Sequence, residues 1–573
     1  MRPLRSNQVE AFKYSLREQH PALFMEMRLG KSLVVIRRCN LYKPRDAKRG
    51  LRVLVIAPGS ALGSWWEELT LPDKEGVDEN EVVWLQGKRA ERVAALQRND
   101  ATWYLLNREG FQILPEIAGM TYCDSCAGKG YTLTKELEVG DRVSFKEPDE
   151  EAPAEEKTKK GKKRKGKKLK GVLVSIENVG GVDECYKVAV DSGEDVECEY
   201  EGDGSCVQQL ERESCSGCRG SGRVKLPDPP IGWDVVVIDE SPFIKTPAAL
   251  VTKFATKNFR EVPHRWILAG RPNPENDLEY FSQFQFLDGS FCGSLNYYEH
   301  RGRFYKPGWD GYGWEPKKGT DDLISAAVGS RAFIQRRKDV GMEKEKILIN
   351  RWLKMPVKLR KAYDQLEQDF VLQFDGMQER STIWRTTQYV WLRQMCGGWL
   401  GKEQCVWDGK VRVLSELLEG ELKGEQVVVW YNFNNEITAS SELLLRKHIT
   451  CATMTGKTKK PERERRRREF QKGNIQVLLI QQAVAQMGMD LSAADTAIYF
   501  SEPTGFLART QTEDRILSVA KDTPLLFIHL LVKNSVDVDV RNALAAKEHR
   551  NDLSLNNALK VAMRLRWGGE HGS

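Results

Sequence analysis

The sequence lacks the features that would place the protein in a membrane or outside the cell. No apolar run in the 573 residues reaches the roughly 20 residues that a membrane-spanning helix needs. The first eight residues contain no apolar core of the kind that signal peptides carry. We therefore predict an intracellular protein with no membrane partner. It would be cytoplasmic in a bacterium or a phage-infected host, which the absence of long regulatory tails favours, and nuclear in a eukaryote.

Closely spaced cysteines are also scarce. The 12 cysteines are scattered irregularly except for two CxxC motifs. In a reducing compartment this spacing favours a metal site rather than disulfides.

Neither sign of charge dominates, because the net charge is only +7, with a pI near 8.6. Such an excess favours a polyanionic partner, although it is also compatible with an ordinary soluble protein. A chain of this length with 40% hydrophobic residues can bury several cores, so we expect three or four domains.

A short phosphate-binding pattern stands near the start of the chain. Residues 25–32 end in Gly30-Lys31-Ser32. Backbone N–H groups of such a loop can approach phosphate, while Lys31 contacts the β- and γ-phosphates and the Ser32 hydroxyl binds magnesium. Met25 replaces the first glycine of the strict eight-residue pattern, and Gly-Lys-Ser strings also occur by chance. On this motif alone, an ordinary helix start stays open.

Two acids elsewhere in the chain complement this loop. Asp239 and Glu240 directly follow the apolar run 235–238. Such a run is typical of a buried parallel strand that presents carboxylates at the carboxyl edge of a sheet, where α/β folds bind nucleotides. Asp239 would hold magnesium through its water shell, and Glu240 would orient the attacking water. We therefore predict a site that hydrolyses a nucleoside triphosphate.

Composition changes divide the chain. Short apolar runs alternate with helical patterns before and after a Cys-, Gly- and charge-rich stretch, which is the rhythm of βαβ units. Helical patterns dominate from about 320 to 420. We predict an α/β protein made of a first lobe in two parts (1–120, and 224–340 with a helical protrusion), an insertion (121–223), a second lobe with a leading helical segment (341–545) and a helical tail (546–573).

The order of motifs resembles that of superfamily 2 helicases, most closely the Swi/Snf-type translocases, including smaller bacterial and phage members. Residues 239–245 resemble the family's "DEAH-IK", residues 268–272 resemble "LTGTP", and residues 57–65 resemble "AP-S-L--W", a DNA-backbone contact. The other segments that carry the resemblance, in chain order, are 4–8, 333–338, 392–396, 455–470, 487–496 and 511–515.

The resemblance implies two RecA-like lobes that bind ATP and magnesium between them, with Arg515 as an arginine finger. The residues it implies for the nucleotide site are Gln8, which would read adenine, Gly30, Lys31, Ser32, Asp239, Glu240, Gly488, Asp490 and Arg515. The implied activity is ATP-driven translocation along DNA, which would be duplex or branched and contacted through its backbone. Two alternatives remain: an RNA helicase, and a weakly hydrolysing, ATP-gated nucleic-acid clamp.

The sequence also departs from that family. Ser518 stands where a second arginine usually follows Arg515. Arg515 would therefore act alone, or another basic residue such as Lys521 would substitute for the second arginine. Pro242 replaces the histidine beside the acids, and Arg271 replaces a threonine of "LTGTP". These changes predict slow hydrolysis or altered coupling between hydrolysis and movement.

The insertion carries two CxxCxGxG repeats that resemble DnaJ-type zinc modules. Cys123, Cys126, Cys215 and Cys218 supply four thiolates, which suit a closed, structural zinc site that clamps the ends of the insertion together. The knuckles occupy residues 121–130 and 213–223. The alternative is a pair of free-thiol turns.

Between the knuckles the sequence predicts a small barrel over residues 136–205, which resembles SH3 or Tudor barrels and would bind nucleic acid or a partner protein. Its strands are expected at 139–145, 171–176, 185–190 and 196–200, from their alternation. A merely structural hairpin cluster is the alternative. Residues 147–170, acidic and then basic, should form a disordered loop that either grasps DNA or serves as a solvated linker.

Overall fold

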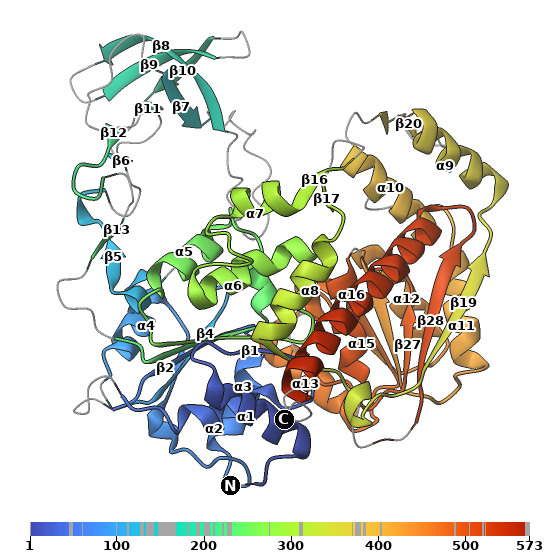
Figure 1. The fold of residues 1–573 in the computed structure, drawn as a ribbon. Coiled ribbons are helices and arrows are strands. Elements are labelled where there is room, and N and C mark those ends of the chain that lie inside the picture. Colours follow the sequence, from blue (N-terminus) through green and yellow to red (C-terminus); the bar gives the residue numbers. More distant parts are fainter. Residues whose placement is uncertain are drawn as a thin grey trace. The chain divides into compact units, whose positions relative to one another are not determined.

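The computed structural model divides the chain into two compact units, 1–114 with 232–573 and 115–231 (Figure 1). In the part of the chain that the structure describes, no helix is long and apolar enough to span a membrane. The described residues are 2–44, 50–59, 61–98, 100–111, 114–126, 131–132, 142–146, 168–179, 183–190, 195–199, 207–209, 213–219, 223–225, 232–273, 276–308, 313–369, 371–372, 380–381, 385–400, 404–485, 489–503, 505–517, 521 and 523–567.

The first lobe is built on a seven-stranded, fully parallel sheet in the order β18-β1-β15-β14-β2-β4-β3. Because all strands point the same way, the loops after β1 and β14 leave the sheet at the same edge, separated by β15 alone. The strands are β1 (Ala22–Met25), β2 (Val53–Ala57), β3 (Val82–Leu85), β4 (Trp103–Asn107), β14 (Val235–Asp239), β15 (His264–Ala269) and β18 (Ala332–Gln335).

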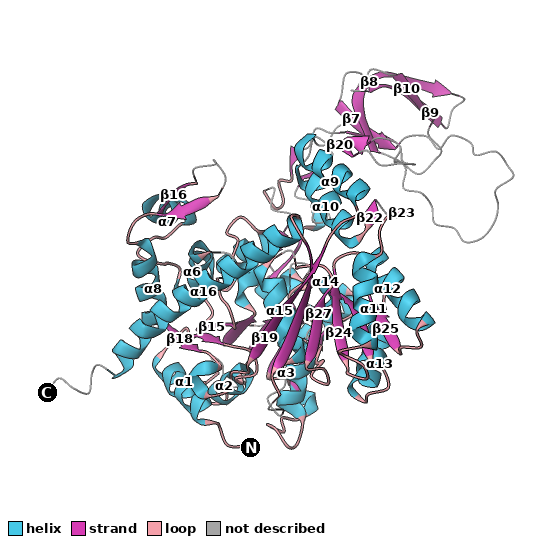
Figure 2. Cartoon of the chain, turned by 90° about the vertical axis from the view of Figure 1, so that its right-hand side faces the viewer, coloured by secondary structure: helices cyan, strands magenta, loops and turns pink. Residues whose placement is uncertain are grey.

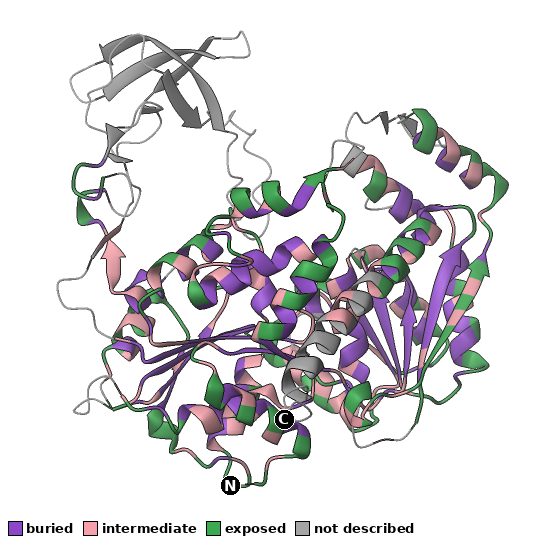
Figure 3. Cartoon of the chain, viewed as in Figure 1, coloured by how far each residue is buried: buried purple, intermediate pink, exposed green. Residues whose placement is uncertain are grey.

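Helices cover both faces of this sheet (Figure 1), which is why its strands are mostly apolar and almost entirely buried (Figure 3). On one face, Val55 and Val237 pack with residues of α1 to α3. On the other, the Phe24 ring meets Phe284 of α6 edge to face, with ring centroids 6.1 Å apart. The helices are α1 (Ser6–Arg17), α2 (Lys31–Cys39), α3 (Ala61–Thr70), α4 (Arg89–Leu96), α5 (Leu250–Asn258), α6 (Tyr280–Asp288), α7 (Tyr297–Phe304) and α8 (Thr320–Arg331).

The second lobe has a six-stranded parallel sheet in the order β19-β28-β27-β24-β26-β25. Figure 2 shows β19, β27, β24 and β25 in succession. The strands are β19 (Lys346–Leu353), β24 (Val427–Tyr431), β25 (Cys451–Met454), β26 (Val477–Gln481), β27 (Thr496–Tyr499) and β28 (Leu525–Val532). The two parallel sheets confirm the predicted α/β class and are consistent with two RecA-like lobes.

Strand β19 corrects one prediction. We expected residues 320–420 to be mainly helical, but residues 346–353 form the edge strand of the second sheet. Most of its residues are exposed, including Leu348 and Trp352, and only Leu353 is buried. An edge strand of this kind lacks the fully apolar pattern of the central strands, so its signal was overlooked among the neighbouring helices.

Alternate residues of the central strands fill two cores, one on each face of the second sheet. Val427 and Val429 belong to one core, and Val428 and Trp430 belong to the other. The helices are α9 (Val357–Asp369), α10 (Arg385–Gly397), α11 (Gly409–Glu419), α12 (Asn434–Arg446), α13 (Lys460–Gln471), α14 (Gln482–Ala485), α15 (Phe506–Ile516) and α16 (Val536–Trp567). Helix α16 packs against α8 of the first lobe as well as β28 and α10 of the second.

The unit 115–231 contains an antiparallel sheet in the order β10-β9-β8-β7-β11. The strands that precede and follow this sheet in the chain form the short pairs β12-β6 and β13-β5. Four of its strands coincide with the four that the alternating pattern predicted, whereas closure into a barrel stays a prediction. Most of the charged loop 147–170 lies outside the described residues. The strands are β5 (Met120–Tyr122), β6 (Tyr131–Thr132), β7 (Arg142–Lys146), β8 (Lys168–Val179), β9 (Asp183–Val190), β10 (Asp195–Glu199), β11 (Val207–Gln209), β12 (Glu213–Ser214) and β13 (Arg223–Lys225).

Three short hairpins complete the lobes. They are formed by β16 (Tyr305–Pro307) with β17 (Trp314–Pro316), β20 (Val371–Leu372) with β21 (Arg380–Ser381), and β22 (Trp399–Leu400) with β23 (Gln404–Cys405).

Candidate active site and metal centre

The phosphate-binding pattern forms the loop between β1 and α2. Gly30 is the N-cap of α2 and has φ 84°, a left-handed conformation that favours glycine. Lys31 and Ser32 therefore occupy the first turn of α2, where unpaired backbone N–H groups create an anion-binding position. The Lys31 ammonium donates to the Met25 carbonyl at 2.8 Å, which folds its side chain back across the loop.

Helix α1 supports this loop from behind. The Gln8 side chain is buried, and its Nε2 donates to the Leu29 carbonyl at 3.4 Å while its Oε1 accepts from the Arg5 N–H at 2.9 Å. Asn7 Nδ2 donates to the same Leu29 carbonyl at 3.2 Å. A side chain at position 30 would collide with Gln8, since a Cβ there would lie 1.9 Å from Gln8 Nε2. Gln8 thus contacts the phosphate loop directly, and its predicted role in reading adenine stays a prediction.

The two predicted acids lie at the end of β14. Asp239 is buried, and its carboxylate accepts from Trp65 Nε1 at 2.9 Å and from the Glu240 N–H at 3.0 Å. Glu240 has φ 53°, an uncommon conformation for this residue type that is typical of functional turns. Trp65 belongs to the segment expected to contact the DNA backbone, but its indole is buried against Asp239. Trp65 thus contacts the acid directly, and the DNA-backbone contact expected of segment 57–65 stays a prediction.

Charges from both lobes act on Glu240. Burial raises the pKa of Glu240 above its ordinary value, the Asp239 carboxylate raises it further, and the Lys31 and Arg515 charges lower it. Burial lowers the pKa of Arg515, and the charges that act on it include Asp514, Glu240 and Asp490. Lys31 and Glu240 from the first lobe and Arg515 from the second thus share one electrostatic environment.

Ion pairs join the lobes beside these residues. Arg337, which follows β18, contacts Asp514 of α15 through Nη1 at 2.9 Å, and its backbone N–H donates to Glu26 of the phosphate loop at 2.9 Å. Arg28 of the same loop pairs with Asp490 of the second lobe at 2.9 Å. Sequence reasoning identified Asp490 but missed Glu26, Arg28 and Arg337 as site residues. Glu26 and Arg28 stand inside the phosphate-binding pattern, which was the available signal.

Hydrogen bonds connect the residue after the two acids, Ser241, to the segment 268–272. Ser241 Oγ donates to Gln283 Oε1 at 2.6 Å, and Gln283 Nε2 donates to the Pro272 carbonyl at 2.6 Å. Arg271 lies in the cleft, 3.9 Å from Glu26 and stacked over the Phe506 ring of α15 at 5.2 Å. The arginine that replaces the expected threonine therefore bridges the two lobes.

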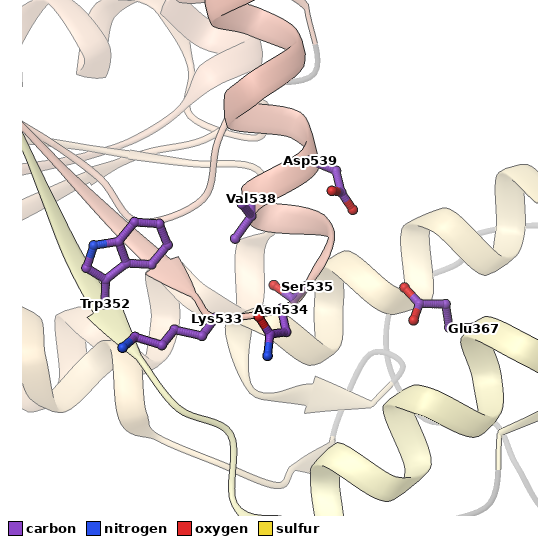
Figure 4. Close-up of a pocket in the computed structure, with 7 residues that line it drawn as sticks. All are labelled: Trp352, Glu367, Lys533, Asn534, Ser535, Val538 and Asp539. Atoms are coloured by element: carbon purple, nitrogen blue, oxygen red, sulfur yellow. The ribbon is translucent and has the colours of Figure 1, made fainter.

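The space between the lobes at this point is small. A cavity of about 30 Å³ is lined by Glu26, Glu240, Arg271 and Arg337 together with residues of α15. Two larger cavities lie elsewhere. One of about 600 Å³ is formed by the second lobe and lined by Trp352, Glu367, Lys533, Asn534, Ser535, Val538 and Asp539 (Figure 4). The other, of about 720 Å³, lies between the first lobe and α16. Neither contains the predicted site residues, so cavity size does not locate the chemistry here.

Of the remaining predicted residues, the structure describes Lys521 but not Gly488 or Ser518. Lys521 Nζ donates to the Ala493 carbonyl at 2.8 Å and lies 3.4 Å from Asp495, so its described contacts keep it within the second lobe. Gly488 and Ser518 lie outside the described residues.

The four predicted zinc ligands come together in the unit 115–231. Cys123, Cys126, Cys215 and Cys218 are buried, and their sulfur atoms all lie within 4.8 Å of one another. The Cys123–Cys215 and Cys126–Cys218 Sγ pairs are 3.8 and 3.7 Å apart. A tetrahedron with zinc–sulfur bonds of about 2.3 Å has sulfur–sulfur edges of about 3.8 Å, whereas a disulfide bond measures about 2.05 Å. The cluster therefore has the dimensions of a tetrathiolate metal site.

Comparison with known proteins gives a family match and several partial relatives. Residues 409–519 match the family described as "Helicase conserved C-terminal domain". The "Chromatin-remodeling ATPase INO80" of Emericella nidulans is 26% identical over 143 residues, which are 24% of this chain and 9% of that protein. The "Uncharacterized ATP-dependent helicase MG018" of Mycoplasma genitalium is 22% identical over 316 residues, 53% of this chain and 29% of that protein.

Two further matches extend the comparison. The "SWI/SNF chromatin-remodeling complex subunit snf22" of Schizosaccharomyces pombe is 20% identical over 351 residues, 56% of this chain and 20% of that protein. A solved structure, "Sulfolobus solfataricus SWI2/SNF2 ATPase core in complex with dsDNA", covers 98% of this chain and 95% of its own at 15% identity and a TM-score of 0.35. The matched regions span only 9% to 29% of the three curated relatives' lengths. The chain is therefore similar, over parts of its length, to an ATP-dependent helicase and to chromatin-remodeling proteins, and its second lobe matches a helicase family.

Proposed function

We propose that the protein is an ATP-dependent DNA translocase or remodelling enzyme that hydrolyses ATP between its two lobes. The observation that carries the proposal is that Lys31 of the first lobe and Arg515 of the second both act on Glu240, beside the Arg28–Asp490 and Arg337–Asp514 ion pairs that join the lobes. Phosphoryl transfer requires a cation on the phosphates, a carboxylate that positions the attacking water, and an arginine, which here comes from the opposite lobe.

Each of these groups has a distinct task. Lys31 and the N–H groups at the start of α2 would bind the phosphates, and Arg515 would stabilise the charge that develops on the γ-phosphate. Glu240 would orient the attacking water, and its restricted backbone conformation keeps the carboxylate at a fixed position. Because hydrolysis removes the anion that both lobes contact, the lobes would bind each other less tightly afterwards, and alternating closure would drive movement.

Magnesium fits the same edge of the sheet. Ser32 and Asp239 offer a hydroxyl and a carboxylate, and hard oxygen ligands of this kind suit magnesium. The Trp65 indole and the Glu240 N–H both donate to the Asp239 carboxylate and hold it in position. Bound there, magnesium would neutralise phosphate charge.

DNA is the proposed track because two curated relatives are described as chromatin-remodeling proteins, and the net charge favours a polyanion. Helix α13 adds a basic surface. Arg465 and Arg468 are about two-thirds exposed, while Glu462 and Glu464 pair with the arginines along the helix. Backbone contacts carry no base information, so binding should be independent of sequence and should weaken with salt.

Phosphate release measured with duplex, forked and single-stranded DNA and with RNA, at two salt concentrations, tests this proposal. We expect duplex or forked DNA to stimulate the wild type well above Lys31→Ala. Stimulation by RNA alone would favour the RNA helicase. Nucleotide-dependent DNA binding without any stimulated hydrolysis would favour the ATP-gated clamp and overturn the motor.

We also propose that the cysteine cluster holds one structural zinc ion. Four thiolates leave no coordination position for a substrate, so the ion would stabilise the unit and take no part in hydrolysis. The cluster lies beside the β5-β13 pair, where the chain enters and leaves this unit. Zinc would therefore fasten the two ends of the inserted segment to each other, as the sequence predicted.

Metal analysis of the purified protein tests the zinc site. We expect about one zinc per chain in the wild type and in Cys405→Ser, because Cys405 is exposed and lies in the second lobe. Cys215→Ser should lose most of the metal. Unchanged zinc content in Cys215→Ser would contradict the assignment.

A further inference from the structure

Arg28 is an unusual residue at the phosphate loop. It lies two residues before Gly30 and has φ 68°, so a long, branched-end side chain occupies a left-handed backbone position. Outside Gly, Asn and Asp such a conformation costs about 1 kcal/mol or more, and residues held in it are concentrated at functional sites. A glycine would fit here without strain, which makes the charged side chain itself the feature to explain.

Hydrogen bonds from α1 and the residue before it hold the loop around Arg28. The Arg28 carbonyl accepts from Arg5 Nη2 at 3.2 Å, and the next carbonyl, of Leu29, accepts from Asn7 Nδ2 at 3.2 Å. Both donors belong to α1 and the residue before it. With these two carbonyls drawn toward α1, the Arg28 side chain is directed to the opposite side, toward the second lobe.

There Arg28 meets Asp490, with Nη2 to Oδ1 at 2.9 Å. The pKa of Asp490 is lowered: partial burial acts to raise it, but the Ser492 hydrogen bond and the Arg28 charge outweigh burial. The two side chains are 30% and 52% exposed. A pair this exposed contributes about 0–1 kcal/mol, so another anion can displace Asp490 at little cost.

The surroundings of this pair are already cationic. Arg28 is among the charges that act on Arg515, and Arg515 in turn acts on Glu240 together with Lys31. Three cations, Lys31, Arg28 and Arg515, are therefore linked through their action on Glu240 or on one another. Like charges repel, so this set is stabilised by an anion placed among them, and a triphosphate carries more such charge than a diphosphate.

Resting on the function proposed above, we propose that Arg28 is a second catalytic cation, which leaves Asp490 for the γ-phosphate when ATP binds. Unlike Arg515, it comes from the same loop as Lys31. During hydrolysis the water oxygen bonds to the γ-phosphorus as the bond to the β–γ bridging oxygen breaks. ADP leaves with the electron pair of that bond, and the proton lost by the water passes to a phosphate oxygen. Arg28 exchanges no proton in this step. It stabilises the equatorial oxygens and returns to Asp490 after phosphate leaves.

This exchange makes Asp490 a competitor of ATP. In the absence of a γ-phosphate, the Arg28–Asp490 pair links the phosphate loop to the second lobe. With ATP bound, Asp490 loses its partner and faces a phosphate of like charge. Arg28→Gln and Asp490→Asn both break the ion pair, but their effects on ATP should be opposite, because only the first removes the cation that the phosphate uses.

Four variants separate a catalytic role from a merely structural one: Arg28→Gln, Arg28→Lys, Asp490→Asn and the control Arg412→Gln. The control breaks an exposed ion pair between Arg412 of α11 and Asp408, the residue before that helix. Kd values for ATP and ADP and the kcat are measured for each. Arg28→Gln should lower kcat by about 100-fold or more and weaken ATP binding more than ADP binding. Arg28→Lys should recover part of the loss. Asp490→Asn should tighten ATP binding, and Arg412→Gln should match the wild type.

Equal effects of Arg28→Gln and Asp490→Asn, or equal losses for ATP and ADP, would overturn this role of Arg28. Arg28→Gly, which relieves the backbone strain, is the second variant if Arg28→Gln fails to fold, and the same loss of ATP preference is expected. Failure of the proposed function is recognised separately, because it would show as wild-type hydrolysis no faster than Lys31→Ala. The ATP-to-ADP affinity ratio needs no turnover and tests Arg28 in that case as well.

Discussion

The two lobes share a parallel α/β sheet but differ in how they use the carboxyl edge of that sheet. In the first lobe this edge carries the phosphate loop, Asp239 and Glu240, and three of the residues there, Arg28, Gly30 and Glu240, have left-handed backbones. In the second lobe the same edge is closed by internal contacts. The Ser501 hydroxyl donates to Glu436 at 2.7 Å and accepts from the Asn432 N–H at 2.9 Å, and His529 pairs with Glu502 at 2.5 Å.

The difference teaches where a ligand can enter. Nucleotides bind at the carboxyl edge of open α/β sheets, where polar groups of the edge can contact the ligand instead of one another. The second lobe uses its polar groups for its own stability and contributes Arg515 from α15 instead. We therefore expect changes at the first edge to affect hydrolysis more than stability, and changes at the second edge to affect stability more than hydrolysis.

The largest expected effect is on hydrolysis. Arg515→Ala should lower kcat by about 10³-fold, because an arginine finger contributes that much or more to the transition state. The melting temperature should change little. Steady-state phosphate release and a thermal melt of the same preparation measure both. A variant that lost its melting transition in parallel with its activity would break the distinction between the two edges.

A stability effect is expected at the second edge. Lys410 is buried, and its ammonium donates to Asp537 at 2.7 Å and to the Phe500 carbonyl at 2.8 Å. Lys410→Met leaves the Asp537 carboxylate buried without its cation, which should cost about 3–5 kcal/mol. Hydrogen exchange of the β24 amides reports this loss within the second lobe.

The control for this prediction lies on the same helix. Arg412 and Asp408 form an exposed pair, so Arg412→Met should cost less than about 1 kcal/mol. ATP affinity should be the same in both variants. If Lys410→Met exchanged at wild-type rates, the second edge would not be held by its internal charges.

The smallest effect depends on pH. Burial raises the pKa of Glu436 to about 7, while Lys410 and the Ser501 hydroxyl act to lower it. Because the folded state holds this proton more tightly than the unfolded state, the contribution of Glu436 to stability is present at low pH and is lost as pH rises through about 7.

Glu436→Gln removes that dependence. The variant should gain up to about 3 kcal/mol over the wild type at pH 8 and almost nothing near pH 4.5. Thermal melts at both pH values measure the difference. A gain that was equal at the two pH values would show that Glu436 does not titrate in the folded protein.

Much of this arrangement follows from local sequence. The runs 235–238 in β14 and 427–430 in β24 are apolar at every position, which indicates buried parallel strands, and the parallel sheets confirm the α/β class. Strand β19 was missed because its mostly exposed residues have no such pattern. The grouping of four cysteines could be anticipated from spacing, since each CxxC turn places its two thiols together.

Other contacts could not be anticipated because they depend on packing between distant segments. Trp65 donates to Asp239 across 174 residues, and Arg28 meets Asp490 across 462. No local pattern specifies such partners. Arg28 was visible inside the phosphate loop, but its partner became apparent only when the second lobe was placed beside it.

The most direct test of the central claim is displacement of a triplex-forming strand from duplex DNA, followed with ATP, with ADP and without nucleotide. We expect the wild type to displace the strand only with ATP, and Lys31→Ala to leave it in place. Displacement by Lys31→Ala, or by the wild type without ATP, would contradict a motor driven by the site between the lobes.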